Sequence, residues 1–335
     1  MNGSMRCACT TDDFDMGITL GTGTFGRVRL GRHKASGKHI AIKILKKYDL
    51  VRLKQVKHVT AERDVLSSVN HPFIIKLFQT FHDPKYIYMV FEFIRGGELF
   101  SLLRSARKLK SPVARFYCAS VFVAFEHLHS KSIAYRDLKP ENILIDDAGY
   151  IKVVDFGFAK EIEFVTYTLC GTPEYMAPEI ITNRGHGKGV DWWALGILIY
   201  EAIHGQPPFC GDTAMQTYEL ILKGKLIFPR NFSSSYAKSL VKKLLVRDLT
   251  KRLGCRKGGP DDIKTSKWFK SFKWTHLVER RMKPPWKPKV GDDADTTYYG
   301  RYSEPTKEQR LNVRALEPKD DPFGDFDRCV VGIAA

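Results

Sequence analysis

The stretch that decides the fold reads Tyr-Arg-Asp-Leu-Lys-Pro-Glu-Asn over residues 135–142, and Asp-Phe-Gly follows at residues 155–157. In it, Asp137 can accept the proton of an attacking hydroxyl, and Lys139 can neutralise a phosphate in transit. Hard oxygen ligands suited to Mg²⁺ come from Asn142 and Asp155. Phosphoryl transfer needs mainly positioning and charge neutralisation, so these residues predict that chemistry. A bare Asp-Phe-Gly would be weak evidence, and a polar loop followed by a surface hairpin would leave the spacing unexplained.

A glycine-rich motif lies upstream and fits either a phosphate-binding hairpin or a dinucleotide fingerprint. The fingerprint needs a helix after its third glycine, but residues 27–30 alternate polar and apolar side chains as a half-buried strand does. The sequence therefore predicts a hairpin over phosphates, in which glycines let backbone N–H groups approach the anion. The motif consists of Gly21, Thr22, Gly23, Thr24, Phe25 and Gly26, with Phe25 at the tip.

An apolar run over residues 40–45 contains a single cation, Lys43. A buried ammonium needs an anionic partner. Glu62, in the amphipathic run 56–69, can supply one carboxylate, and nucleotide phosphates can supply the rest. Alone, Lys43 would be read as a solvent-facing residue at a strand end; beside the glycine motif, an ion pair is the better prediction.

From about residue 14 to residue 272, the sequence resembles a eukaryotic protein kinase of the AGC group, in its cyclic-AMP-dependent branch. The resemblance implies an α+β fold with a small β-rich lobe, a larger helical lobe, and Mg-ATP in the cleft between them. It also implies a C-terminal tail that wraps the small lobe. The motifs that carry it are residues 135–142, 155–160, 168–179, 191–196 and 248–252.

The pattern of the chain predicts its organisation. Strand-like runs surround one helix over residues 14–91, and the sequence becomes helical after Gly96-Gly97, as over residues 114–129. Near the end, residues 323–326 resemble the AGC hydrophobic motif, whose two aromatics fill a pocket on the small lobe. We predict an N-terminal extension (1–13), a small lobe with hinge (14–94), a large lobe (95–272) and a tail (273–335).

The resemblance assigns ATP and Mg²⁺ as cofactors and places the hinge at residues 92–95. Backbone groups of Glu92 and Ile94 are expected to bond adenine. Phe91 replaces the usual Met behind the adenine pocket, so bulky inhibitors that reach this recess should bind poorly. Besides the glycine motif, the predicted nucleotide-binding residues are Val28, Ala41, Lys43, Glu62, Phe91, Glu92, Ile94, Glu98 and Leu144.

Thr168 stands where the family carries its activating phosphate. A phosphate there would gain charge-assisted hydrogen bonds from Arg136, Lys160 and His58. The family favours arginine shortly before its acceptor, yet Glu-Phe-Val occupies residues 163–165. We therefore predict inefficient autophosphorylation and dependence on an upstream kinase.

Substrate choice is expected to depend on carboxylates, because paired arginine and carboxylate groups form bidentate bonds. By resemblance, Glu98 faces an arginine three residues before the acceptor, Glu141 and Glu201 face one two residues before, and Glu174 reaches further upstream. Together they predict substrates with arginine before the Ser or Thr, although any one could be a solvated surface residue. The residue after the acceptor is expected to meet an apolar pocket of Leu169, Pro173 and Met176. As structural elements, the family implies that Asp191 braces the catalytic loop and that Glu179 pairs with Arg252.

Charge and composition agree with this interpretation. A formal net charge of +17 favours acidic partners, and a solvated basic helix over residues 46–58 explains much of it. We find no aromatic-interleaved basic motif of the nucleic-acid-binding kind, no membrane-spanning apolar run and no signal peptide. Seven scattered cysteines fit a reducing compartment, so a cytoplasmic location is expected, with the nucleus as a second option. Cys170 is either thiolate-prone beside cations or a small packed residue.

The N-terminus gives two smaller expectations. Asn2 excludes N-myristoylation, which needs glycine after the initiator Met. Cys7 and Cys9 are either palmitoylation sites or part of a frayed end.

Departures from the family sequence leave undecided which regulatory partners this chain binds. Val154 replaces Thr, and Gln206 and Cys210 replace aromatics that grip a pseudosubstrate inhibitor. Tyr167 stands where Trp would contact a regulatory subunit, although Arg104 and Tyr218 match other contact positions. The alternatives are therefore a basophilic AGC kinase without cyclic-nucleotide control, or a pseudokinase scaffold. The intact set of Lys43, Glu62, Asp137, Asn142 and Asp155 argues against the scaffold.

Overall fold

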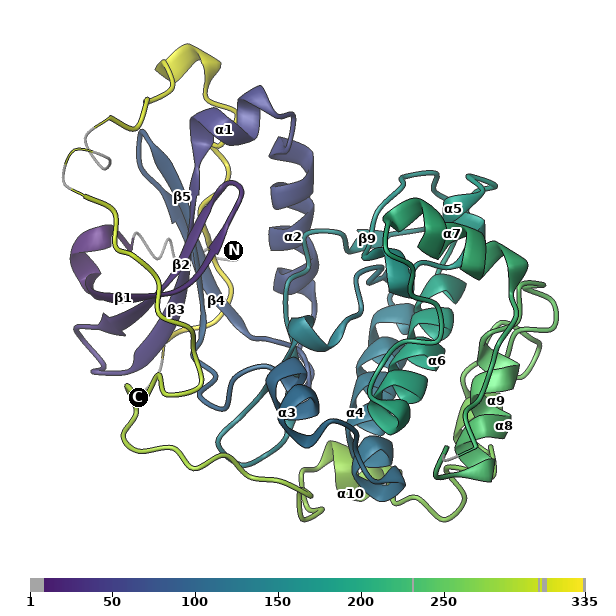
Figure 1. The fold of residues 1–335 in the computed structure, drawn as a ribbon. Helices are drawn as coiled ribbons and strands as arrows, with labels where there is room; N and C mark the ends of the chain where they lie inside the picture. The colour runs from purple at the N-terminus through teal and green to yellow at the C-terminus, as the bar shows by residue number, and fades with distance from the viewer. Residues whose placement is uncertain (1–8, 231, 307, 309–311, 334–335) are drawn as a thin grey trace, which may run out of the picture. The chain divides into compact units, whose positions relative to one another are not determined.

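The computed structural model describes residues 9–230, 232–306, 308 and 312–333, so Asn2 and Cys7 lie outside the described residues. Its contacts divide the chain into two compact units. The first comprises residues 1–70, 75–96 and 289–335, and the second comprises residues 71–74 and 97–288. Figure 1 shows that the first unit is built mainly of strands and the second mainly of helices. The lobe and tail boundaries predicted above stay predictions.

The first unit is an antiparallel sheet with two helices between its third and fourth strands. Its sheet order is β1-β2-β3-β5-β4-β10. Alternation along β3 places Ile40 and Ile42 on the face that packs with Phe14, Phe81 and Val90 in the core. The elements are β1 (Phe14–Gly23), β2 (Gly26–His33), β3 (His39–Lys46), α1 (Lys47–Arg52), α2 (Val56–Ser68), β4 (Leu77–His82), β5 (Tyr86–Glu92) and β10 (Arg328–Cys329), with short 3-10 turns at Thr11–Asp13 and Pro318–Asp320.

The expectation of one helix in this part of the chain was wrong, because α1 is separate from α2. The basic run is also not wholly solvated. Lys47 is fully buried, its Nζ lies 2.5 Å from a carboxylate oxygen of Asp321, and it stands over the ring of Phe323. A buried ammonium requires such a carboxylate, and among the described residues it comes from Asp321 in the predicted tail.

The tail completes the sheet of the first unit. Phe323 and Phe326 are each 1% exposed, and Arg63 of α2 lies over the ring of Phe326 and donates to the carbonyl of Asp325. The chain then forms β10, which pairs antiparallel with β4 through Arg328 opposite Thr80. Strand β10 covers an edge that would otherwise present unpaired backbone groups.

Truncation after Phe326 is expected to destabilise the first unit. It removes β10, the two hydrogen bonds from Val330 and Val331 to the carbonyl of Phe78, and the His82–Asp327 contact. At about 1 kcal/mol per backbone bond, we expect a loss of about 2–4 kcal/mol and a fall in Tm of about 5–10 °C, measured by scanning calorimetry. Arg328→Ala, which removes only a surface ion pair with Asp64, serves as the control and should change little. An unchanged Tm in the truncated chain would show that β10 contributes no stability.

The second unit is centred on two long helices, α4 (Ser111–Ser130) and α6 (Gly189–His204), which pack against each other. Residues 190–203 of α6 are all buried, which explains the nearly unbroken apolar sequence. Helix α10 lies at the start of the predicted tail, and its Leu277 is fully buried. The remaining elements are α3 (Leu99–Ala106), β6 (Ile133–Ala134), β7 (Ile143–Ile145), β8 (Ile151–Val153), β9 (Lys160–Glu161), α5 (Pro178–Ile181), α7 (Ala214–Lys223), α8 (Ser235–Leu244), α9 (Asp261–Lys264) and α10 (Trp274–Val278), with 3-10 turns at Pro140–Asn142 and Pro173–Tyr175.

In the part of the chain that the structure describes, no helix combines the length and the apolar character needed to cross a membrane.

Candidate active site

The catalytic loop is held by a buried carboxylate from α6. Asp191 is fully buried and accepts hydrogen bonds from the backbone N–H groups of Tyr135 (2.9 Å) and Arg136 (2.8 Å). Its Oδ2 also lies 2.7 Å from Nε2 of His129. Arg136 has φ 69°, a left-handed conformation that costs free energy unless neighbours fix it. These bonds supply that restraint, so the predicted brace is confirmed.

Asp137 lies at the centre of the polar network in this loop. Its Oδ2 accepts from Nδ2 of Asn142 (2.8 Å) and lies 3.1 Å from Nζ of Lys139. Its Oδ1 accepts from the hydroxyl of Thr172 at 3.2 Å. Burial raises the pKa of Asp137, Lys139 partly offsets this, and the nearby carboxylate of Asp155 adds to the rise. The structure thus brings together the predicted base, cation and amide, and it adds Thr172, which sequence reasoning missed.

Asn142 and Asp155 differ in how they are held. The side-chain N–H₂ of Asn142 donates both to the carbonyl of Asp137 and to its carboxylate, which leaves the amide oxygen as the group that could bind a cation. Asp155 is exposed, has φ 56°, and accepts from the N–H of Gly157. Among the described residues, no group of three or more His, Cys, Asp or Glu side chains could hold a metal ion. A cation here would need ligands beyond these two.

In the first unit, the predicted nucleotide-binding side chains share one face of the sheet. Val28 lies opposite Lys43 in the β2–β3 pair, and Ala41 lies opposite Phe91 in the β3–β5 pair. Lys43 and Ala41 are two residues apart on β3, so their side chains leave the same face, away from the core that contains Ile42. The register therefore gathers four of the predicted residues.

The glycine motif forms the turn between β1 and β2, and its glycines differ in their surroundings. A Cβ on Gly26 would lie 1.8 Å from the carbonyl oxygen of Ile44, so no side chain fits there. A Cβ on Gly21 or Gly23 would meet nothing within 4 Å. Gly26 is therefore explained by packing within the sheet. The first two glycines are not, and they leave the backbone open to a ligand.

Lys43 and Glu62 form the predicted ion pair within the first unit. The ammonium lies 2.7 Å and 2.9 Å from the two carboxylate oxygens, so β3 is joined to α2. The side chain of Glu62 is 4% exposed, and that of Lys43 is 22% exposed. The pair is desolvated enough to need a close partner, which each residue provides for the other.

Two tail residues contact parts of this unit that are far away in the sequence. The hydroxyl of Tyr299 donates to the carbonyl of Ile94, and its ring packs near Phe93 of the predicted hinge. Glu304 accepts from the backbone N–H of Thr19 at 2.6 Å and lies 3.4 Å from Arg29, so it ties the tail to the base of the glycine hairpin. Burial acts to raise the pKa of Glu304, but the hydrogen bonds with Thr19 and the charges of Arg29 and Arg27 together outweigh it, so the pKa is lowered.

The activation segment presents Thr168 to solvent. Arg136 donates from Nε to the carbonyl of Phe158, and its guanidinium makes no ion pair with a carboxylate among the described residues. Burial lowers the pKa of Arg136. Lys160 donates to the hydroxyl of Thr166 rather than to Thr168. The third predicted cation, His58, belongs to the first unit, where Nδ1 lies 2.8 Å from Oε1 of Gln55.

The predicted substrate carboxylates are of two kinds. Glu98 and Glu141 are exposed, and the pKa of Glu98 is raised by partial burial and by Glu141 nearby. Glu201 is buried: it accepts from the hydroxyl of Tyr175 (2.5 Å) and pairs with Arg104 (3.0 Å). A substrate arginine that binds Glu201 would therefore contact a carboxylate that already pairs with Arg104. Glu174 is half-buried.

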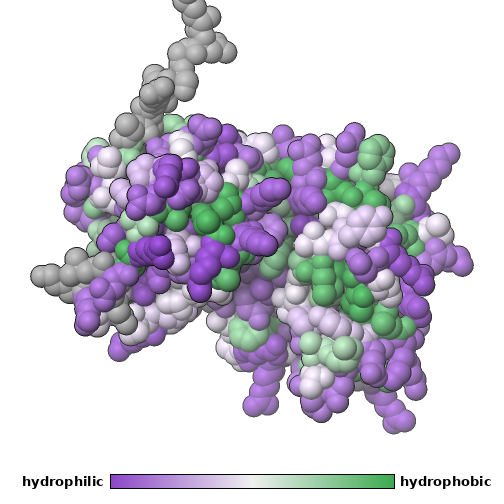
Figure 2. All heavy atoms as spheres, turned by 90° about the horizontal axis from the view of Figure 1, so that it is seen from above, coloured by the Kyte–Doolittle hydropathy of each residue, from purple (hydrophilic) through white to green (hydrophobic). Residues whose placement is uncertain are grey.

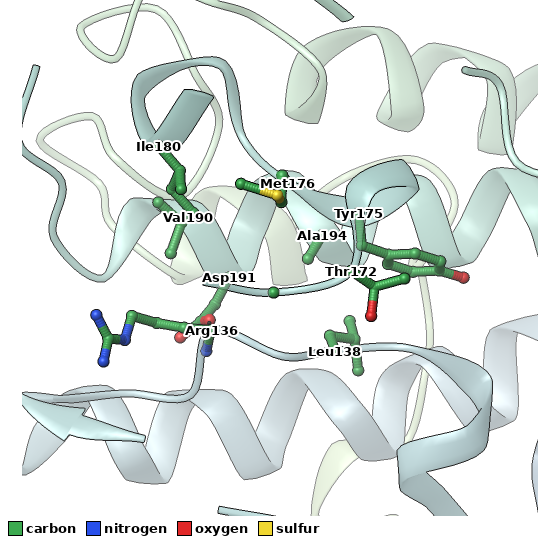
Figure 3. A pocket seen from close by; sticks show the side chains of 10 residues that line it. Arg136, Leu138, Thr172, Tyr175, Met176, Ile180, Val190, Asp191 and Ala194 are labelled. Carbon is green, nitrogen blue, oxygen red and sulfur yellow. Dashed lines mark hydrogen bonds between the residues drawn. The ribbon is translucent and has the colours of Figure 1, made fainter. Parts of the chain in front are cut away.

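The three predicted apolar substrate contacts lie in different surroundings. Leu169 is 63% exposed and Pro173 is half-buried, but Met176 is buried and lines a pocket with Ile180 and Val190 (Figure 3). Figure 2 shows apolar side chains gathered on the surface of the helical unit. The large apolar residues that are exposed in residues 158–169 and in α7 are Phe158, Phe164, Val165, Tyr167, Leu169, Met215 and Leu220.

Cys170 is a packed residue rather than a thiolate. It is buried, and burial raises the pKa of its thiol more than Arg136 lowers it. The structure thus favours the simpler of the two interpretations of this cysteine.

Comparisons with known proteins agree with this geometry. The protein kinase domain family model matches residues 14–269. The chain is 51% identical over 292 residues to the human cAMP-dependent protein kinase catalytic subunit PRKX, covering 87% of this chain and 81% of the relative. It is 48% identical to cAMP-dependent protein kinase type 3 of Saccharomyces cerevisiae, covering 94% and 78% of the two chains. Against cAMP-dependent protein kinase catalytic subunit 3 of Drosophila melanogaster it is 48% identical, covering 94% and 54%. The chain therefore belongs to the protein kinase domain family and groups with the catalytic subunits of cAMP-dependent serine/threonine kinases.

Proposed function

We propose that this kinase transfers the γ-phosphoryl group of ATP to Ser or Thr in substrates that carry arginine before the acceptor. The observation that best supports this proposal is the position of the Asp137 carboxylate, which is in contact with Thr172, Lys139 and Asn142. A carboxylate fixed in this way can accept the proton of an incoming hydroxyl. Lys139, beside it, can neutralise the transferring phosphoryl group.

The predicted ATP contacts are supported within each unit taken by itself. In the first unit, open space at Gly21 and Gly23 supports backbone contact with phosphates, and Lys43, oriented by Glu62, supports an ionic contact. The carbonyl of Ile94 is taken by Tyr299, so its N–H is the group that we assign to the purine edge. In the second unit, the backbones of Glu98 and Leu144 pair with each other in an isolated β-bridge. Their contacts with ATP are assigned from the resemblance alone.

Mg²⁺ fits the donor set of the second unit. The amide oxygen of Asn142 and the carboxylate of Asp155 are hard ligands, and phosphate oxygens and water would complete the coordination. Asp155 also raises the pKa of Asp137 by repulsion, a repulsion that a bound cation would reduce. Bound Mg²⁺ supplies charge neutralisation at the phosphates.

Thr168 is expected to be poorly phosphorylated in protein produced in bacteria, because no basic residue directly precedes it and an upstream kinase is needed. Intact-mass and phosphopeptide spectrometry would measure this. Full phosphorylation of Thr168 in the wild type that disappears in Lys43→Met would contradict the prediction. Phosphorylation by an added upstream kinase should then raise activity, and Arg136→Gln should reduce that gain, because the phosphate would be the missing anion for Arg136.

Substrate preference gives the most direct test of the proposed function. The assay compares a peptide with two arginines ahead of one serine with a peptide in which both arginines are glutamine. Glu98→Gln should reduce the preference for the arginine peptide by about 10–100-fold, the value of one charged hydrogen-bonded pair. Glu279→Gln, an exposed carboxylate of the same unit, is the control. No transfer to either peptide, even with Thr168 phosphorylated, would favour the scaffold alternative.

Control by a cyclic-nucleotide-binding regulatory subunit is the finer part of the proposal. The relatives' names support it, and exposed Arg104, which matches a regulatory-subunit contact position of the family, supports a docking surface on this chain, whereas Tyr167 departs from the family. Capture of the chain by a regulatory subunit, with release on adding cyclic AMP, would distinguish it from an AGC kinase under other control. A cytoplasmic location stays a prediction.

A further inference from the structure

A long basic stretch of the second unit contains no carboxylate. Residues 220–247 run from the end of α7 through a loop and along α8, and they include no Asp or Glu. Lys223 pairs weakly with Glu219 at the surface. The other cations make no ion pair with any described residue, and we call them the basic face: Lys225, Arg230, Lys238, Lys242, Lys243 and Arg247.

The fold gathers these cations on one surface. Helix α8 lies at the edge of its unit (Figure 1) and buries Ala237, Leu240, Val241 and Leu244, which turns its lysines outward. From α8, Lys238 and Lys242 both lie over the ring of Phe228 in the loop, at 5.1 Å and 5.9 Å. Arg247 approaches Gly224, where a Cβ would lie 3.3 Å from its Cδ, so it joins the loop cations from the other end of α8. The loop and the helix therefore present one continuous positive surface.

An apolar side chain projects from the same surface. Ile227 is 62% exposed, although its backbone is fixed by a hydrogen bond from the hydroxyl of Tyr200 to its carbonyl (2.9 Å). Next to it, the ring of Phe228 packs at a tilt against Tyr200 and edge-to-face against Phe232, beneath the two lysines. An exposed large apolar side chain in this basic stretch gains free energy if an apolar phase receives it.

We propose that the basic face docks this kinase on an anionic lipid bilayer, with Ile227 entering the interfacial region. Each lysine or arginine near an anionic bilayer strengthens binding about fivefold, and an inserted apolar residue strengthens it further. Lysine stems over Phe228 can extend along an apolar surface while the ammonium groups remain in the headgroup layer.

The side chains on this face favour a lipid surface over an acidic protein or a nucleic acid. Four of the six cations are lysines, which act as mobile point charges, whereas specific carboxylate or phosphate recognition usually employs the rigid fork of arginine. Single-stranded nucleic acid would need open aromatic faces, and Phe228 is covered by Lys238 and Lys242.

The test uses the full chain with sedimented vesicles of phosphatidylcholine alone or mixed with phosphatidylserine. Neutralising Lys225, Lys238, Lys242 and Lys243 to Gln together should weaken binding to the mixed vesicles by about 100-fold or more. The matched control neutralises four exposed lysines elsewhere in the same unit: Lys108, Lys110, Lys267 and Lys270. Ile227→Ser should weaken binding several-fold without changing the dependence on salt. Phosphotransfer to a peptide reports that each variant is folded.

The outcomes are distinct. Binding to mixed vesicles that falls with salt, is lost in the fourfold variant and is kept in the control supports the proposal. Equal binding to both vesicle types, or equal loss in the two fourfold variants, overturns it. Binding to an acidic peptide or to single-stranded RNA that exceeds binding to mixed vesicles overturns the choice of a lipid surface. The inference is independent of the substrate preference proposed above.

Discussion

Asp137→Asn is expected to lower kcat by about 10²–10⁴-fold, the usual contribution of a positioned general base. The amide keeps the size of the side chain, its oxygen can still accept from Asn142, and its N–H₂ can donate to the hydroxyl of Thr172, so the loop should keep its geometry. What it loses is the ability to accept a proton and the charge that pairs with Lys139. Steady-state assays with a peptide substrate at saturating Mg-ATP would measure the change.

The control for this variant separates catalysis from folding. Thr172→Val removes one hydrogen bond to the same carboxylate and should have a much smaller effect, because Asn142 and Lys139 still hold the base. Nucleotide affinity, measured by thermal shift with Mg-ATP, should be nearly unchanged in Asp137→Asn. If kcat fell less than tenfold in a folded, nucleotide-binding variant, Asp137 would not be the base.

The sequence predicted the parts of the site that depend on short segments. Residues 135–142 bring Asp137, Lys139 and Asn142 together because eight consecutive residues cannot separate them far. The Lys43–Glu62 pair could be predicted because an isolated cation in an apolar strand needs a partner, and the next amphipathic run supplied it.

The contacts that could not be predicted join residues far apart in the sequence. Lys47 pairs with Asp321, Tyr299 with the carbonyl of Ile94, and Glu304 with Thr19, and none of these pairs shares a local pattern. Strand β10 is only two residues long, too short for an alternation to be seen. The contacts of Glu201 with Arg104 and Tyr175 also join residues that are far apart in the sequence, and no local pattern indicates them.

Arg252→Met is expected to cost about 3–5 kcal/mol of unfolding free energy in the helical unit, because it leaves Glu179 as a buried charge without its partner. Arg252 is fully buried, and its Nη atoms lie 2.6 Å and 2.8 Å from the two carboxylate oxygens of Glu179. It also donates to the carbonyls of Val246 and Gly189, so one side chain joins three segments. Urea unfolding followed by tryptophan fluorescence isolates this unit, since residues 192, 193, 268, 274 and 286 are the only tryptophans and all belong to it.

The double variant Arg252→Met with Glu179→Leu shows whether the unpaired charge or the lost packing causes the fall in unfolding free energy. If the unpaired carboxylate is the main cost, removing it should restore part of the stability, leaving a deficit from the carbonyls of Val246 and Gly189 of about 1–3 kcal/mol each at most. If the double variant is as unstable as the single one, the hydrogen bonds to those carbonyls and the contact of Arg252 with the Trp193 ring determine the stability. In that case the ion pair serves mainly to orient Arg252, and Arg252→Lys, which keeps the charge but loses the fork, should be nearly as damaging as Arg252→Met.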